Sequence, residues 1–264
     1  MAETMDKIYN ALVVSVAALG SANTQELKFN QNTIDLVNGV WGYFALIGIG
    51  LTLIYFLLEM NRKYALEGRD MTLKTAFLPF LKLMIAIAVI ANGGNIVGIL
   101  IGLHNTIVQG VTDTLVKDGA MDILSGSNAF DVGFIEKIIL ILGLIGCLVV
   151  TLVVRLAWSY KAILFKVEYL YRIAITPIAL GDIYSGNNST AMKWLKSFLA
   201  LALYAIAFII LPQVATKLAF TGATVTITDP LSLLGALASL LVAPIAALGC
   251  LSAAKQAANQ ALGV

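Results

Sequence analysis

The chain has 264 residues, of which 59% are hydrophobic and 12% are charged, and its formal net charge at pH 7 is +2. Soluble domains contain about 25% charged residues, so this composition and a mean hydropathy of +0.90 exclude an ordinary water-soluble protein. We therefore predict an all-α integral membrane protein in which residues 1–264 form one polytopic domain.

About five segments are long and apolar enough to cross a membrane. A hydrocarbon core of about 30 Å requires about 20 helical residues, and four windows meet this requirement. A fifth window, residues 76–91, is shorter and contains Pro79 and Lys82, yet we interpret it as a span. The predicted transmembrane helices are residues 37–60, 76–92, 137–158, 197–217 and 231–252.

Three further segments lie outside these predicted spans. Residues 1–36 are interpreted as an amphipathic extracytoplasmic segment, although residues 5–22 also resemble a signal peptide. Residues 95–135 combine an outer amphipathic helix with a polar loop. Residues 159–196 continue the third span into a broken helical hairpin on the cytoplasmic side.

The distribution of basic residues predicts the orientation of the chain. If the loops alternate between the two faces, residues 61–75, residues 155–196 and the C-terminal tail hold eleven of the 17 Lys and Arg residues. Cytoplasmic loops are enriched in Lys and Arg. The N-terminus is therefore predicted to lie outside and the C-terminus inside.

Residues 96–116 form an amphipathic pattern at 100° per residue. The polar arc includes small residues at four-residue spacing, among them Gly94, Gly98 and Gly102. This helix either lies in the outer interface or lines a pore or an oligomer contact, for which these three glycines are the candidates. His104, the only histidine, projects from the apolar arc and is predicted to be packed and hydrogen-bonded rather than to bind a metal.

Charged side chains continue beyond the third predicted span. Lys161, Glu168 and Arg172 fall within about 60° of each other on a helix, and the last two form an i,i+4 pair. Charges at membrane depth are costly and normally face a partner or water. They are therefore either solvated side chains on a helix that leaves the bilayer or the lining of a water-facing inner vestibule.

The helical pattern breaks at Pro177, which cannot donate a backbone hydrogen bond. Gly181 and Asp182 follow, and Tyr184 is too apolar for a free loop. We predict a structured corner on the inner face that docks other proteins, with Asp182 within reach of the cations of Arg172 and Lys193.

The same region resembles a known family. The resemblance is carried by Tyr171-Arg172, by Pro177 to Tyr184, by Ser185-Gly186 to Ser189 and by Ala191 to Lys196. This stretch is similar to the segment before the penultimate span of TrbL-like proteins, which are polytopic inner-membrane subunits of conjugative type IV secretion systems. The resemblance is sharpest over residues 155–215. The chain lacks the long hydrophilic C-terminal domain of the larger members, so the functions of that domain are not carried over.

The resemblance implies a non-enzymatic channel or scaffold subunit in the bacterial inner membrane. Such a subunit would form a ring-like homo-oligomer in membrane lipid, around the route of DNA or protein-DNA cargo, without sequence-specific nucleic-acid binding. The implied partners are cytoplasmic ATPases, which supply the energy, and pilus or other extracytoplasmic components.

The residues by themselves leave two alternatives open. A small transporter or channel would place its site in the charged, broken helix over residues 155–186, and would also use Lys82. A membrane enzyme acting on lipid-linked substrates would recruit the acidic residues predicted on the outer side, Asp113, Asp118, Asp122 and Asp131. We predict no enzyme, cofactor or metal, because the sequence contains no phosphate-binding glycine loop and no metal-ligand spacing.

Overall fold

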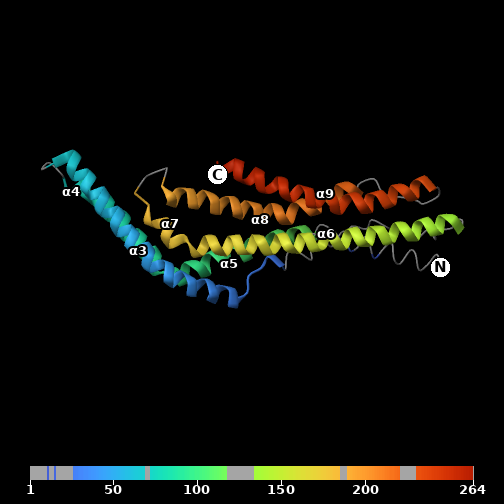
Figure 1. Cartoon of the computed structure of the whole chain (residues 1–264), viewed down its shortest axis with the longest axis horizontal. Helices are drawn as coiled ribbons and strands as arrows, with labels where there is room; N and C mark the ends of the chain where they lie inside the picture. The colour runs from blue at the N-terminus through green and yellow to red at the C-terminus, as the bar shows by residue number, and fades with distance from the viewer. Residues whose placement is uncertain are drawn as a thin grey trace. The chain divides into compact units, whose positions relative to one another are not determined.

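The computed structural model describes residues 11, 15, 26–68, 72–117, 134–184, 189–220 and 230–263. Almost all of these residues are helical and none of them lies in a strand, so the all-α class is confirmed for this part of the chain (Figure 1). The helices are α3 (Gln31–Glu67), α4 (Leu73–Ala91), α5 (Gly93–Lys117), α6 (Phe134–Ala174), α7 (Thr176–Gly181), α8 (Thr190–Phe220) and α9 (Pro230–Leu262).

Local sequence accounts for the ends of α3 and for the start of α4. Asn30 Oδ1 accepts a hydrogen bond of 3.0 Å from Thr33 N, an N–H that no carbonyl within the helix can reach. The helix ends at Gly68, whose φ of 59° lies in the left-handed region that glycine adopts most readily. Thr72 caps α4 in the same way as Asn30 caps α3, because its hydroxyl accepts a bond of 3.4 Å from Thr75 N.

Five helices of the described chain are long and apolar enough to cross a membrane. They are Gln31–Leu66, Gly93–Asp113, Ile141–Ala174, Thr190–Ala215 and Leu240–Leu262. The predicted number is confirmed, but one member of the set differs. The segment Gly93–Asp113, expected to be an outer amphipathic helix, is among the five, whereas the apolar helix over Thr75–Ala91, expected to be a span, is shorter than they are.

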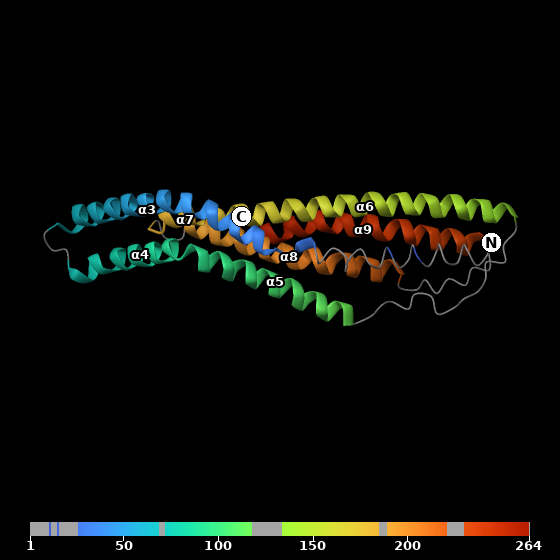
Figure 2. The same cartoon turned by 90° about the horizontal axis from the view of Figure 1, so that it is seen from below.

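The chain does not reverse direction between α4 and α5. Only Asn92 separates the two helices, and helical hydrogen bonds of 3.1 Å continue across it, from Asn92 N to Ala88 O and from Ile96 N to Asn92 O. The beginning of α5 therefore extends α4 after a bend (Figure 2). At 1.5 Å per residue, the 19 residues of α4 add about 28 Å to a helix that α5 continues.

A tryptophan occupies the bend between α4 and α5. The indole Nε1 of Trp41 in α3 donates a hydrogen bond of 3.0 Å to the carbonyl of Ile90. A Cβ atom on Gly93 would collide with the indole ring, so a residue without a side chain is needed there. Trp41 is buried, and this contact ties the first half of α3 to the joint between the two later helices.

A lysine compensates for the proline inside α4. Pro79 has no N–H, so the carbonyl of Thr75, four residues earlier, loses its helical donor. Lys63, near the end of α3, donates from its Nζ to that carbonyl at 3.0 Å. The same contact holds the C-terminal end of α3 against the N-terminal end of α4.

The chain divides into two compact units, each drawn from several stretches of sequence. Unit 1 comprises residues 1–28, 107–164 and 204–257, and unit 2 comprises residues 29–106, 165–203 and 258–264. Helices α5, α6, α8 and α9 therefore contribute residues to both units.

In unit 1, the first part of α6 packs against α9 and α8. A Cβ on Gly143 would lie 2.6 Å from Leu237 Cδ1, so glycine allows close approach at this point. The thiol of Cys147 lies 3.7 Å from the Leu237 carbonyl, and the Trp158 ring meets the edge of Phe208 with centroids 4.9 Å apart. Cys147 is a free, buried thiol, and a free cysteine in such surroundings packs as a small hydrophobic side chain.

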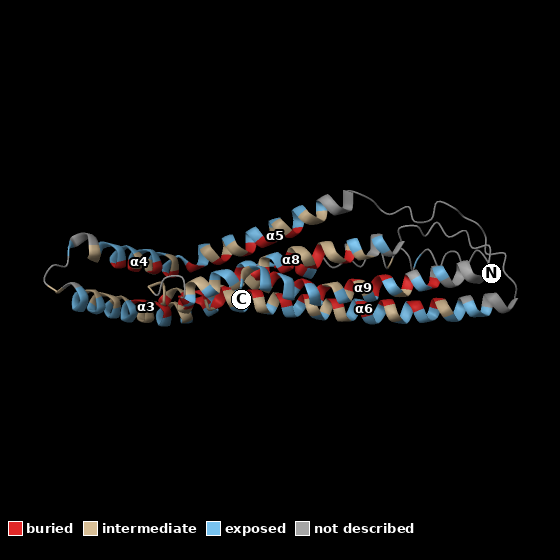
Figure 3. Cartoon of the chain, turned by 90° about the horizontal axis from the view of Figure 1, so that it is seen from above, coloured by how far each residue is buried: buried red, intermediate tan, exposed pale blue. Residues whose placement is uncertain are grey.

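In unit 2, α3 contacts both α4 and the short helix α7. Figure 3 shows exposed positions along the length of α3 and α4. Many of these exposed side chains are large and apolar, as expected for helices whose surroundings are hydrocarbon rather than water. They include Leu46, Ile47, Leu57, Leu58, Phe77, Phe80, Leu81 and Met84.

The sequence predicts three segments on two different faces of the membrane, but contacts between these segments contradict that placement. Residues 1–36 and 95–135 were assigned to the outer face and residues 159–196 to the inner face. The structure packs Phe29 against Tyr169 with ring centroids 5.4 Å apart, and Tyr169 Oη donates a hydrogen bond of 3.0 Å to the Leu100 carbonyl. A hydrocarbon core of about 30 Å cannot separate groups in contact. The end of α6 therefore lies at the same depth as residues 29 and 100.

Candidate functional site at the corner between α6 and α8

The corner that joins α6 to α8 begins with a break after Ala174. Ile175 interrupts the helix, and α7 then starts with Thr176 and Pro177, a position where the missing proline N–H costs no helical hydrogen bond. Thr176 and Pro177 are buried, as are Ala179 and Gly181. The predicted break is therefore present, and it is a buried short helix rather than an open loop.

Polar side chains on both sides of residues 185–188 organise the start of α8. Ser189 Oγ accepts a hydrogen bond of 3.1 Å from Met192 N, which makes Ser189 the N-cap. Asp182 Oδ2 accepts bonds of 3.1 Å from both the backbone N and the Oγ of Thr190. These bonds place its carboxylate at the positive N-terminal end of α8. Its proximity to the cations of Arg172 and Lys193 stays a prediction.

Arg172 connects the end of α6 to the beginning of α8. Its guanidinium forms a salt bridge of 2.6 Å with Glu168, and it also donates to the carbonyl of Ser197. The carbonyl of Arg172 accepts a bond of 2.8 Å from the indole Nε1 of Trp194. The two side chains of the salt bridge are only 20% and 30% exposed. The predicted i,i+4 pair is thus part of a hydrogen-bonded corner. This corner also includes Trp194, which belongs to the stretch that carries the resemblance, and Ser197, which no sequence pattern indicated.

Lys161 belongs to a different part of the structure from Glu168 and Arg172. Its Nζ donates a hydrogen bond of 2.9 Å to Ser252 Oγ of α9, within unit 1. Glu168 and Arg172 belong to unit 2. The three residues share one face of α6, but they have separate partners.

Pro177 and Gly181 lie against the middle of α3. A Cβ on Gly48 would lie 2.6 Å from the carbonyl carbon of Pro177, and a Cβ on Gly181 would lie 2.9 Å from Leu51 Cβ. Both glycines therefore permit the two backbones to approach closely. If α3 crosses the membrane, α7 lies at its mid-depth, where non-helical backbone must be buried in protein or face water.

Tyr184 attaches the corner to α4. Its Oη donates a hydrogen bond of 3.4 Å to the carbonyl of Pro79, and its ring lies 6.4 Å from that of Phe56. The ammonium of Lys82 lies 5.9 Å from the centroid of the same ring, within reach of a cation–π interaction. Burial raises the pKa of Tyr184 to about 12, so the phenol keeps the proton that it donates.

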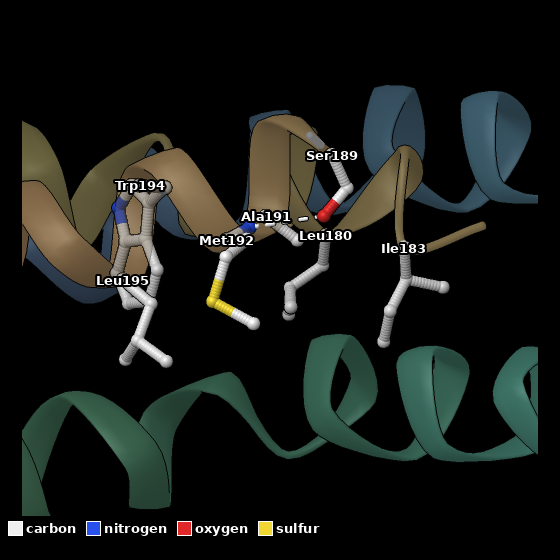
Figure 4. A pocket seen from close by; sticks show the side chains of 7 residues that line it. All are labelled: Leu180, Ile183, Ser189, Ala191, Met192, Trp194 and Leu195. Atoms are coloured by element: carbon white, nitrogen blue, oxygen red, sulfur yellow. Dashed lines mark hydrogen bonds between the residues drawn. The ribbon is translucent and has the colours of Figure 1, made fainter. Parts of the chain in front are cut away.

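An apolar groove of about 400 Å³ lies along this corner (Figure 4). Leu180 of α7, Ile183, and Met192 and Leu195 of α8 point their side chains to the same side of the ribbon. The complete lining is Leu180, Ile183, Ser189, Ala191, Met192, Trp194 and Leu195. No sequence pattern indicated this groove, because its wall forms only when α7 and α8 meet.

The three candidate contact glycines of α5 leave an open surface. A Cβ on Gly98 or Gly102 would meet nothing within 4 Å, and one on Gly94 would meet only Asn38 Oδ1 at 3.9 Å. Among the described glycines, an added Cβ would come within 3 Å of other atoms instead at Gly48, Gly93, Gly143 and Gly181. The assignment of the α5 glycines to an oligomer contact stays a prediction.

His104 is a packed residue, as predicted. It is 4% exposed, and its ring lies 5.0 Å from Phe29, 5.7 Å from Phe165 and 4.8 Å from Tyr169. The side-chain amide of the neighbouring Asn105 bonds to the backbone of Phe29. It accepts a bond of 3.0 Å from Phe29 N and donates one of 3.1 Å to Phe29 O. No sequence pattern indicated this clamp on Phe29.

No group of three or more His, Cys, Asp or Glu residues that could hold a metal ion is found among the described residues. Asp118, Asp122 and Asp131, three of the acids considered for a membrane enzyme, lie outside the described residues. The fourth, Asp113, accepts hydrogen bonds of 2.9 and 3.1 Å from Gln109 Nε2.

Neither a protein-family model, nor a curated protein, nor a solved structure matches the chain. The resemblance to TrbL-like proteins therefore depends on the motif residues alone.

Proposed function

We propose that the protein is a multi-pass subunit of a type IV secretion system, where it acts as a channel or scaffold around the route of DNA or protein cargo. The proposal is supported by the resemblance over residues 155–215 and by one structural observation. Those residues of the resembling stretch that the structure describes form a part-buried, hydrogen-bonded corner centred on Arg172. A corner of this kind can hold a fixed surface for a partner subunit, which a flexible linker cannot do.

The proposal includes the assembly and the partners that the resemblance implies. The subunit forms a ring-like homo-oligomer in the bacterial inner membrane, with cytoplasmic ATPases and pilus or other extracytoplasmic components as partners. The cargo is guided without sequence-specific contacts.

The decisive experiment is a transfer assay with a matched pair of arginine variants. Arg172 and Arg155 are both in α6, but Arg155 is exposed, whereas Arg172 makes the bonds described above. In a host strain that lacks its own copy of the gene, Arg172→Gln should reduce transfer of a mobilisable plasmid at least tenfold at normal membrane abundance, and Arg155→Gln should leave it unchanged. Normal transfer by the strain without the gene would refute the secretion role.

The proposed orientation keeps the N-terminus outside and residues 61–75 inside, from the excess of Lys and Arg. In a background without Cys147 and Cys250, Gln31→Cys should react with a membrane-impermeant thiol reagent in intact cells, and Arg62→Cys should react only after lysis. Both native residues are exposed and lie at opposite ends of α3. The reverse labelling pattern would contradict the orientation.

A second candidate, a small transporter or channel, is favoured by the position of α7. Pro177 packs against Gly48 near the middle of α3, and transporters build substrate and ion sites from broken helices at mid-membrane depth. The purified protein in liposomes would then conduct ions or carry a solute without other subunits. Silent liposomes, together with a transfer defect in cells, would eliminate this candidate.

A further inference from the structure

The groove between α7 and α8 is chemically suited to hydrocarbon. Its polar lining groups are already engaged, because Ser189 Oγ accepts the N-cap bond from Met192 N and Trp194 Nε1 donates to the Arg172 carbonyl. The remaining lining side chains, including Leu180 and Leu195, are apolar. Its volume of about 400 Å³ lies within the range of about 300–1,000 Å³ that ligand sites occupy.

Two exposed lysines lie near the start of α8, and Lys196 is the nearer of them to this groove. No ion pair joins Lys193 or Lys196 to a carboxylate among the described residues. At 100° per residue, Lys196 lies about 40° from Met192, which lines the groove, whereas Lys193 lies about 100° from Met192 and about 160° from Leu195. Trp194, between the two lysines, has a side chain of the type enriched at membrane interfaces.

We propose that this groove binds an acyl chain of an anionic phospholipid, with Lys196 beside the headgroup and Lys193 as a more distant cation. The hydrocarbon lining accounts for the chain, and the positive charge, mainly that of Lys196, accounts for the negative headgroup. A second protein copy fits less well, because seven lining residues are few beside the about 20–30 residues per side of a stable protein interface. The proposal rests on the groove and its charges and does not require the secretion role.

Trp194 offers a reporter inside the proposed site. In a variant with Trp41→Phe and Trp158→Phe, it is the remaining tryptophan, and bromine atoms on a nearby acyl chain quench its fluorescence. The detergent-solubilised protein is titrated with brominated phosphatidylglycerol, which is anionic, or with brominated phosphatidylcholine, which is not. Quenching should need several-fold less phosphatidylglycerol, since a basic residue near an anionic lipid contributes about fivefold in affinity.

Two sets of variants separate the contribution of the lysine charges to lipid binding from that of the apolar groove. Lys193→Gln with Lys196→Gln should bring the two quenching curves together. Leu180→Phe, which fills the groove, should weaken quenching by both lipids, whereas Leu199→Phe, at an exposed position of α8 outside the groove lining, should not. Equal quenching by the two lipids in the unsubstituted groove, or no effect of Leu180→Phe, would overturn the proposal.

Native mass spectrometry of the protein with all three tryptophans gives an independent readout. Phosphatidylglycerol adducts should survive in the wild type and be reduced at least fivefold in Leu180→Phe. If Leu180→Phe instead removed a dimer and left the lipid adducts unchanged, a second copy would be the occupant and the lipid assignment would be wrong.

Discussion

A methyl group added at Gly48 tests how tightly α7 is packed against α3. The new Cβ in Gly48→Ala would lie 2.6 Å from the carbonyl carbon of Pro177 and 2.8 Å from its Cβ. Ordinary contacts begin at 3.4 Å, so α7 must move away by about 0.8 Å. The obstacle is backbone and a rigid proline ring, which cannot rotate out of the way.

Two opposing effects set the change in stability expected for Gly48→Ala. Replacing glycine by alanine within a helix stabilises it by about 1 kcal/mol, while overpacking costs about 1–3 kcal/mol. Gly50→Ala, two residues later in α3, receives the same helical gain, and its Cβ would meet nothing within 4 Å. The difference between the two variants isolates the contact with Pro177, and we expect Gly48→Ala to be less stable than Gly50→Ala by about 1–3 kcal/mol.

Thermal unfolding in detergent, followed by circular dichroism, measures this difference. For a protein of this size about 2–4 °C of Tm corresponds to 1 kcal/mol, so Gly48→Ala should melt about 2–12 °C below Gly50→Ala. Equal melting temperatures would show that α7 does not press on α3 at this position, and the argument for a corner at the mid-depth of α3 would then lose its basis.

Three other changes test contacts elsewhere in unit 2. Lys63→Met should lower the free energy of unfolding by about 1 kcal/mol, and the loss should shrink in a Pro79→Ala background, where the helix regains its own donor; an undiminished loss would contradict this role. Asn105→Leu, which removes both bonds to Phe29, should lower Tm, and a Tm equal to that of the wild type would refute the clamp. The pKa of Tyr184 is raised to about 12 by burial, so the stability it contributes is complete below its ordinary pKa of about 10 and is lost as the pH rises through 12. The absorbance difference between wild type and Tyr184→Phe at 295 nm should therefore titrate near pH 12, and a midpoint near 10 would contradict the burial.

Hydropathy and helix-breaking residues were enough to predict the class of the protein and the position of its main break. Long apolar runs can satisfy their backbone hydrogen bonds in hydrocarbon only as helices or closed barrels. Pro177, followed by Gly181 and Asp182, marked the break between α6 and α8, although a proline alone does not end a helix, since Pro79 lies inside α4. The packed state of His104 was also predictable from its place on the apolar arc of α5.

Partners that are distant in sequence were not predictable in the same way. The i,i+4 spacing indicated the pair Glu168 and Arg172, but no pattern could show that Arg172 also reaches Ser197 and accepts a bond from Trp194. For the same reason no pattern could show that Asp182 accepts bonds from the backbone N and the Oγ of Thr190. These contacts depend on the angle at which α7 turns the chain.

Local sequence by itself thus determined the helices, because each one requires only neighbouring residues: apolar runs, caps such as Asn30 and a left-handed glycine at Gly68. The tertiary structure decided which glycines carry close contacts, since the free surface around Gly98 and the collision at Gly48 look alike in sequence. It also decided which segments share a depth. The charge rule assigned Phe29 and Tyr169 to opposite faces from the loops alone, and only the packing of their rings brings them together. Loop charge reports an average preference for one side of the membrane, whereas side-chain contact fixes where individual residues lie.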